Sequence, residues 1–184
     1  ELHHPIEYQN QIFDILFQHG SKLNLKPFGI RAMDSLRIEK SYRLPGKELS
    51  IEYAALESGL NRFVSENKGD FIGRDGLAEW KSKGFSYGFV TLEVHNVKDA
   101  DALGNNPIYL DGKVIGRATS GGYGHRIKKS LVLAMINPSL IKTGLKVKID
   151  ILGTKYDASI INESPYDPSN LSLIHISEPT RPSS

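Results

Sequence analysis

The chain has 184 residues, of which 24% are charged, and its formal net charge at pH 7 is +2. This balance excludes the strongly basic surface that is typical of nucleic-acid-binding proteins, and the lack of cysteine excludes disulfides and cysteine metal sites. No apolar run approaches the ~20 residues of a membrane-spanning helix, so we expect neither a nucleic acid nor a membrane as partner.

The first 42 residues predict two helices. The chain starts "ELHHPIEYQ" without an initiator Met or a signal-peptide pattern, so we expect a piece of a longer protein. Residues 6–19 place apolar side chains on one helical face, and Gly20 follows as a stop. A second helix is expected over 29–42. We expect its solvated face or its local ion pairs to hold Asp34, Arg37, Glu39 and Lys40.

Farther along the chain, the period changes from helical to alternating. A third helix is expected over 71–84, capped by Asp70 and ended by Gly84. From Phe85 onward, "FVTLEV" alternates, and Asp111-Gly112 between apolar runs is a strong hairpin signal. Residues 145–161 alternate again around Gly153. Short strands at this spacing predict a small barrel or sandwich.

The stretch "TSGGYGHRIKKS", residues 119–130, combines glycines with cations and could cradle a phosphate or form a turn. It lacks the spacing GxxxxGK[ST], and no helix clearly follows it. The next run, "SLVLAMI", is short and apolar and ends at Asn137-Pro138, which favours a buried strand. The residues therefore favour a structural turn.

Catalytic motifs are scarce. His3 and His4 lie beside Glu1, but no third metal ligand has an obvious spacing, and neither GxSxG nor HExxH occurs. We predict no metal site.

The last residues, 171–184, "LSLIHISEPTRPSS", have no helical face and resemble a translated sequencing-adaptor read-through, so we expect a non-native tail.

Two long stretches resemble a known family. They are "FGIRAMDSLRIEKSYRLPGKELSIEYAALESGLNRFVSENKGDFIGRDGL" (28–77) and "GNNPIYLDGKVIGRATSGGYGHRIKKSLVLAMI" (104–136), followed by "PYDPSN". Both are similar to the folate-binding aminomethyltransferase family, which includes the glycine cleavage T-protein. The details "IEKSYR", "LNRFV" and "GGYGH" look most like the C-terminal half of dimethylglycine and sarcosine dehydrogenases.

The resemblance implies an α+β fold. Residues 1–84 would be the end of an α/β folate-binding domain, and residues 85–170 a small all-β, barrel-like C-terminal domain. The glycines of "TSGGYGH" would then belong to a loop of the β domain that faces the folate domain rather than to a phosphate loop.

The resemblance also implies a reaction. A one-carbon unit passes from a small N-methylated amine to tetrahydrofolate, forming 5,10-methylene-tetrahydrofolate, and in the dehydrogenases FAD in an N-terminal domain first oxidises the amine. We expect a cytoplasmic protein, or one of the mitochondrial matrix in a eukaryote. The present piece alone would be inactive, because the family's catalytic aspartate lies upstream of it, so we predict no catalytic residue here.

Folate contacts are carried over by position. Glu1 matches the family's glutamate that binds the pterin ring, and a carboxylate can accept two parallel N–H bonds from the pterin. Leu2 and His3 match the adjoining pocket positions. Arg62 stands where one branch has a folate-contacting tyrosine, and Arg31 lies one helical offset from the position of a T-protein arginine.

Three other functions stay open. One is an aminomethyltransferase like the T-protein, and another is a folate-dependent demethylase of the same fold. The third is a folate-binding module without transferase activity, but its relatives carry a cysteine where this chain has Asp70.

Overall fold

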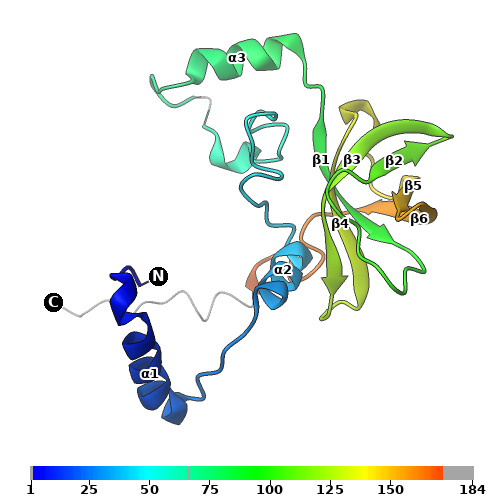
Figure 1. Ribbon diagram of the computed structural model, residues 1–184. Helices are drawn as coiled ribbons and strands as arrows, with labels where there is room; N and C mark the ends of the chain where they lie inside the picture. Colours follow the sequence, from blue (N-terminus) through cyan, green and yellow to red (C-terminus); the bar gives the residue numbers. More distant parts are fainter. Residues whose placement is uncertain (1, 66, 172–184) are drawn as a thin grey trace. The chain divides into compact units, whose positions relative to one another are not determined.

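The computed structural model describes residues 2–65 and 67–171. The chain forms two compact units, Glu1–Met33 and Asp34–Ser184. Figure 1 shows the helices and strands of each unit, which are considered separately below. No helix among the described residues has the length and apolar character needed to cross a membrane.

The first unit is helical. A 3-10 turn, Ile6–Tyr8, leads into α1, Gln9–Gly20, and a second 3-10 turn follows at Ser21–Leu23. The helix over residues 6–19 is thus confirmed, and α1 ends at the expected glycine. The left-handed residue that reverses the chain is Asn24, with φ 59°, not Gly20. Gly20 instead makes room for Leu25, since a Cβ would lie 2.5 Å from the Leu25 Cδ2 atom.

Two further helices differ from the expectation at one end. The second, α2, spans Ile30–Glu39 and is shorter than predicted, because Ser41 takes a φ of 54° that no helix continues. The third, α3, spans Arg74–Lys83. The predicted cap at Asp70 is wrong, because the chain turns into the helix at Gly73, with φ 89°, whereas the stop at Gly84 is confirmed.

Residues 88–161 form a closed, six-stranded antiparallel barrel (Figure 1). The strand order around the barrel is β1-β4-β3-β2-β5-β6. Closure leaves no free edge strand, which confirms the barrel rather than the sandwich. A 3-10 turn, Asn61–Phe63, precedes the barrel, and another, Pro138–Leu140, lies between β4 and β5. The strands are β1 Gly88–Val94, β2 Pro107–Leu110, β3 Lys113–Gly124, β4 Lys129–Ile136, β5 Lys146–Ile151 and β6 Thr154–Ile161.

The predicted hairpin turns are present for the expected physical reason. Asp111 and Gly112, between β2 and β3, have φ values of 49° and 79°. Leu152 and Gly153, between β5 and β6, have φ values of 51° and 82°. Positive φ at both central residues matches the right-handed twist of the strands, and Asp-Gly adopts it at low cost.

The barrel is buried on both faces of β4. Val132, Ala134 and Ile136 belong to the inner core, while Leu131, Leu133 and Met135 belong to a second cluster. That second cluster also contains Ile38, Tyr53 and Phe89. The segment that follows α2 therefore covers one outer face of the barrel, and this packing positions the polar groups described next.

Candidate functional site

A buried carboxylate at the end of α2 holds the glycine-rich motif in place. Glu39 is 1% exposed, and its Oε1 atom accepts the backbone N–H groups of Arg126 at 2.7 Å and Ile127 at 3.3 Å. Gly124 lets this carboxylate approach, since a Cβ there would lie 2.9 Å from the Glu39 Cγ atom. Residues 119–124, with all three glycines, lie on β3, so the expected loop at the glycines is wrong, and the predicted turn is limited to 125–128. The Glu39 side chain accepts the N–H groups of this turn.

The next two residues also join separate segments. The Lys40 ammonium donates to the backbone oxygen of Asp167 and to the Asn170 Oδ1 atom, both at 2.6 Å. The Ser41 hydroxyl shares a 2.8 Å hydrogen bond with Thr91 of β1. The expected solvated face is thus wrong for Glu39 and Lys40, because the chain leaves the helix here and runs along the barrel.

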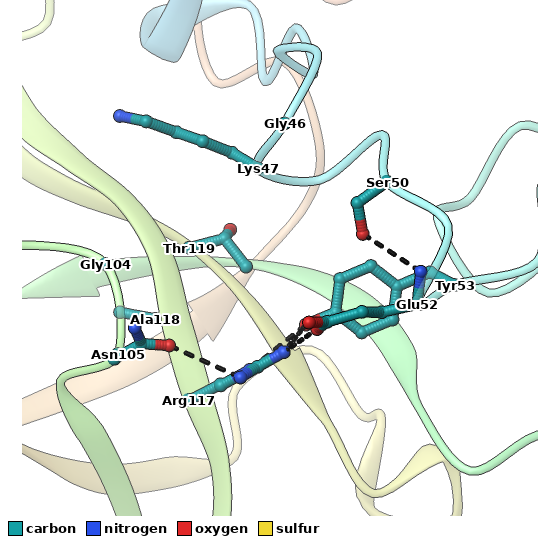
Figure 2. Close-up of a pocket in the computed structure, with 10 residues that line it drawn as sticks. All are labelled: Gly46, Lys47, Ser50, Glu52, Tyr53, Gly104, Asn105, Arg117, Ala118 and Thr119. Carbon is teal, nitrogen blue, oxygen red and sulfur yellow. Dashed lines mark hydrogen bonds and ion pairs between the residues drawn. The ribbon is translucent and has the colours of Figure 1, made fainter.

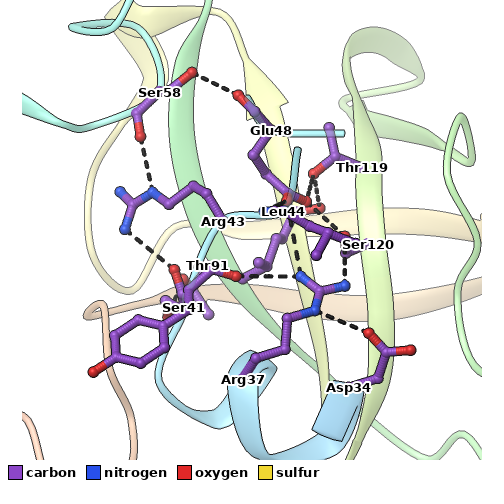
Figure 3. A network of polar contacts seen from close by, with 12 residues as sticks. Asp34, Arg37, Ser41, Arg43, Leu44, Glu48, Ser58, Thr91, Thr119 and Ser120 are labelled. Carbon is purple, nitrogen blue, oxygen red and sulfur yellow. Dashed lines mark hydrogen bonds and ion pairs between the residues drawn. The ribbon is translucent and has the colours of Figure 1, made fainter. Parts of the chain in front are cut away.

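An arginine and a second buried glutamate form the centre of a polar network (Figure 3). Glu48 has no exposed surface, and the hydroxyls of Thr119 and Ser120 on β3 each donate to it at 2.6 Å. Arg37 donates to the Ser120 Oγ atom at 3.0 Å and lies 3.8 Å from the Glu48 carboxylate. Arg37 also pairs with Asp34 at 3.0 Å, which confirms that local ion pair. The network satisfies a buried carboxylate with several donors, as burial requires.

Two more charged residues fix the same segment. The Glu57 carboxylate accepts the backbone N–H groups of Ala54, Ser86 and Tyr87 at 2.9–3.0 Å. The Arg43 guanidinium forms two parallel bonds to Glu163, at 2.9 and 3.0 Å, and lies 3.7 Å from the centre of the Phe89 ring. These contacts hold the segment after α2 against β1 and the chain that follows β6.

A pocket of about 300 Å³ lies next to this network (Figure 2). Arg117 of β3 forms its base and donates to the Tyr53 hydroxyl at 2.6 Å and to Asn105 at 3.3 Å, and it also pairs with Glu52. The hydrogen bond to Tyr53, more than the contact with Glu52, raises the pKa of Arg117 above its ordinary value. Like any arginine, Arg117 is charged at neutral pH.

The lining of this pocket carries two cations and one carboxylate. Lys47 is the second cation in its lining, and within residues 2–65 and 67–171 it has no ion-pair partner. Glu52 is the single carboxylate there. Glu52 already pairs with Arg117, and Figure 2 shows the Lys47 ammonium pointing away from Arg117, so the two cations do not converge on one group. Across the part of the chain that the structure describes, no cluster of three or more His, Asp or Glu residues could hold a metal.

The residues predicted to contact folate are divided between the two units. Leu2, His3 and Arg31 lie in the first unit and Arg62 in the second, and all four are exposed. The Arg62 guanidinium lies 4.6 Å from the centre of the Phe63 ring. Glu1 lies outside the described residues. The role of these residues in folate binding stays a prediction.

Four residues that shape the second unit are not predicted from the sequence. These are Glu48, Tyr53, Glu57 and Arg117. The first three lie in a stretch without helical or alternating period, and their partners are 3 to 72 residues away along the chain. Glu52 and Arg117 are 65 residues apart. The one available signal was the resemblance of the whole stretch to a known family.

Comparisons with known proteins agree with the fold. The model of the GCVT N-terminal domain matches residues 1–68, and that of the glycine cleavage T-protein C-terminal barrel domain matches residues 88–167. The crystal structure of the glycine cleavage system aminomethyltransferase T from Bartonella henselae superposes with a TM-score of 0.76 at 21% identity. That match covers 89% of this chain and 45% of the solved chain.

Curated relatives are more similar in sequence. Human mitochondrial dimethylglycine dehydrogenase is 37% identical over 182 residues, which is 98% of this chain and 20% of the relative. An aminomethyltransferase of Thermoanaerobacter pseudethanolicus is 31% identical over 166 residues, which is 90% of this chain and 45% of the relative. The chain thus spans between a fifth and a half of the relatives it matches. With both domain models matched in order, the chain belongs to the glycine cleavage T-protein family of aminomethyltransferases and dimethylglycine dehydrogenases.

Proposed function

We propose that this chain is part of a tetrahydrofolate-dependent one-carbon transferase, the folate-binding half of a flavin-dependent N-methyl amine dehydrogenase. The observation that carries the proposal is the ordered match of both T-protein domains, with higher identity to dimethylglycine dehydrogenase, 37%, than to aminomethyltransferase, 31%. The substrate would be a small N-methylated amine, and the product 5,10-methylene-tetrahydrofolate. FAD, held by another part of the protein, would supply the oxidation of the N-methyl group.

In this reaction the chain itself would form few or no covalent bonds with the substrate or folate. It would bind folate and hold its nucleophilic nitrogen near the one-carbon unit, and an enclosed site would protect the reactive carbon from water. Glu1 would bind the pterin, beside Leu2 and His3. Arg31 and Arg62 carry planar guanidinium groups, which suit the carboxylates and rings of folate.

The second unit supports a positioning role for the barrel. The segment after α2 is joined to the barrel by hydrogen bonds to three buried carboxylates, Glu39, Glu48 and Glu57.

We propose a division of the chain into three parts. They are a folate-domain part, residues 1–84, a barrel, residues 85–170, and a non-native tail, residues 171–184. We place the protein in the mitochondrial matrix if its source is eukaryotic, and in the cytoplasm otherwise.

The test uses the full-length protein that contains this sequence. Dimethylglycine is oxidised with and without tetrahydrofolate, and free formaldehyde is measured. Folate should lower the formaldehyde released and yield methylene-tetrahydrofolate. Formaldehyde that is unaffected by folate would overturn the transfer role.

A substitution at Glu1 tests the proposed pterin contact. Glu1→Gln removes the charge but keeps the shape, and hydrogen bonds to charged groups contribute about 1.5–3 kcal/mol, so folate affinity should fall at least roughly tenfold. The matched control is Glu79→Gln on the exposed face of α3, which should leave calorimetric folate affinity unchanged. Equal affinities for both variants would place the pterin glutamate elsewhere.

A further inference from the structure

A lysine and a tyrosine approach each other across one strand on the outer face of the barrel. Strand β5 lies between β2 and β6. Tyr109 of β2 lies opposite Lys148 of β5, and Lys155 of β6 lies opposite Asp150 of β5. Ile108, the neighbour of Tyr109, belongs to the inner core, so the Tyr109 side chain points outward.

The Lys155 ammonium lies over the Tyr109 ring. Its Nζ atom is 4.2 Å from the centre of the ring, well within the range of a cation–π contact. Lys148, which is opposite Tyr109, is held instead by Asp157 at 2.7 Å. Lys155 forms no ion pair with residues 2–65 or 67–171. Among these residues, the Tyr109 ring is therefore the partner of the Lys155 ammonium.

This pair combines two groups that formaldehyde can join. A neutral lysine amine adds to a carbonyl carbon, and the adduct loses water to form an iminium ion. A phenol hydroxyl donates electron density to the two ring carbons beside it, so these carbons attack an iminium carbon. The other lysine over an aromatic ring lacks this second group, because Lys68 lies 6.0 Å from the centre of the Phe71 ring, which carries no hydroxyl.

We propose that Tyr109 and Lys155 form a modification site for formaldehyde, in which a methylene bridge joins the two side chains. The Lys155 amine attacks formaldehyde, and the adduct takes up a proton and loses water. A ring carbon of Tyr109 beside the hydroxyl then bonds to the methylene carbon. The electron pair of the C=N bond moves to nitrogen, and the ring carbon releases its proton. One formaldehyde is consumed and one water is released, so the bridge needs no oxidant.

The geometry favours this pair over other lysines and tyrosines. The methylene carbon is one bond away from Nζ, so it can reach the ring face without movement of the backbone. Holding two reactants together makes their reaction unimolecular, and this should raise the yield of the link at least roughly tenfold over pairs that meet by chance. The proposal rests on the proposed function for one point, the source of formaldehyde, which the dehydrogenase would release when folate does not accept the carbon.

The test treats the whole chain with formaldehyde at mildly alkaline pH, where more of the lysine amine is neutral, and maps cross-links by digestion and mass spectrometry. We expect the peptides that contain Tyr109 and Lys155 to be joined, with a mass gain of one carbon atom. Tyr109→Phe keeps a ring beside Lys155 but removes the hydroxyl, so it should abolish the link. Tyr42→Phe is the matched control, because Tyr42 is 42% exposed and no cation of the described residues lies over its ring.

Lys155→Gln removes the amine instead of the phenol and should also abolish the link. Circular dichroism of each variant should match the wild type, since both side chains lie on the outer face of the barrel. Three results would each overturn the proposal: no link between Tyr109 and Lys155, the same yield of linked peptides in Tyr109→Phe, or loss of the link in Tyr42→Phe. Added formaldehyde needs neither folate nor flavin, so this test and the test of the transfer role can fail independently.

Discussion

Strand β4 and helix α1 are both rich in apolar residues, yet they differ completely in burial. Seven of the eight residues of β4 are buried, and Leu131 and Leu133 have no exposed surface. In residues 2–33 not one residue is buried, and Phe13 and Leu16 of α1 are 54% and 45% exposed. An apolar pattern thus predicts which face an element offers, but only a partner element buries that face.

Both faces of β4 are covered by other parts of the second unit. Neighbouring strands and the inner core cover one face, and the segment after α2 covers the other. Within the described residues of the first unit, no side chain of α1 is buried. An isolated helix of 12 residues is marginal in water, because the free-energy cost of nucleation exceeds what a few turns contribute. The barrel and residues 2–33 should therefore respond very differently to equivalent substitutions.

The largest contrast is expected for leucine. Leu133→Ala removes a fully buried side chain, and such changes cost about 2–5 kcal/mol of unfolding free energy. Leu16→Ala on α1 should cost under about 0.5 kcal/mol, as is usual for exposed sites. Urea denaturation followed by far-ultraviolet circular dichroism measures both. Similar losses for the two variants would mean that α1 is packed after all.

The next contrast concerns glutamate. Glu48→Gln weakens the charged acceptor of Thr119, Ser120 and Arg37, and we expect a loss of about 1.5–3 kcal/mol. Glu79→Gln breaks only an exposed pair with Lys83, four residues along α3, and should cost about 0.3–0.5 kcal/mol. If the Glu48 variant is as stable as the Glu79 variant, the network does not hold the segment to the barrel.

A smaller contrast concerns glycine. Gly112→Ala places a Cβ on a residue with φ 79°, which should cost about 1–2 kcal/mol through backbone strain alone, since no atom crowds that position. Gly29→Ala has equal space without a left-handed φ, so it should leave the melting temperature unchanged or raise it. A Gly112 variant that melts at the wild-type temperature would show that the β2–β3 turn relaxes.

The smallest effect should come from an exposed pair on the barrel. The hydrogen bond from Lys148, at 2.7 Å, lowers the pKa of Asp157 below its ordinary value of 3.8. A lowered pKa stabilises the fold above the ordinary value, and this contribution disappears as the pH falls through the lowered one. An NMR titration should show the shift, and Lys148→Gln should return the pKa of Asp157 towards 3.8. An unchanged pKa in that variant would assign the shift to other charges.

Local signals predicted the barrel well. Residues close together in the chain determine the turns at Asp111-Gly112 and Gly153 and the alternating strands. Both turns and the strands around them lie where they were expected. Predictions were wrong where the environment of a residue depends on parts of the chain far away in sequence. Glu39 and Lys40 fit a solvated helix face, and only their contacts with Arg126 and Asp167, 87 and 127 residues away, explain their burial. Asp70 suits a helix cap, but the backbone turns at Gly73.

Native-state hydrogen exchange tests the comparison most directly. The amides of β1, β4 and the tethered N–H groups of Leu44, Ser86 and Arg126 should be protected to a similar, high degree, because buried acceptors hold them in one cooperative unit. The amides of α1 should exchange at close to unprotected rates in the same sample. Protection of α1 equal to that of β4 would contradict the account.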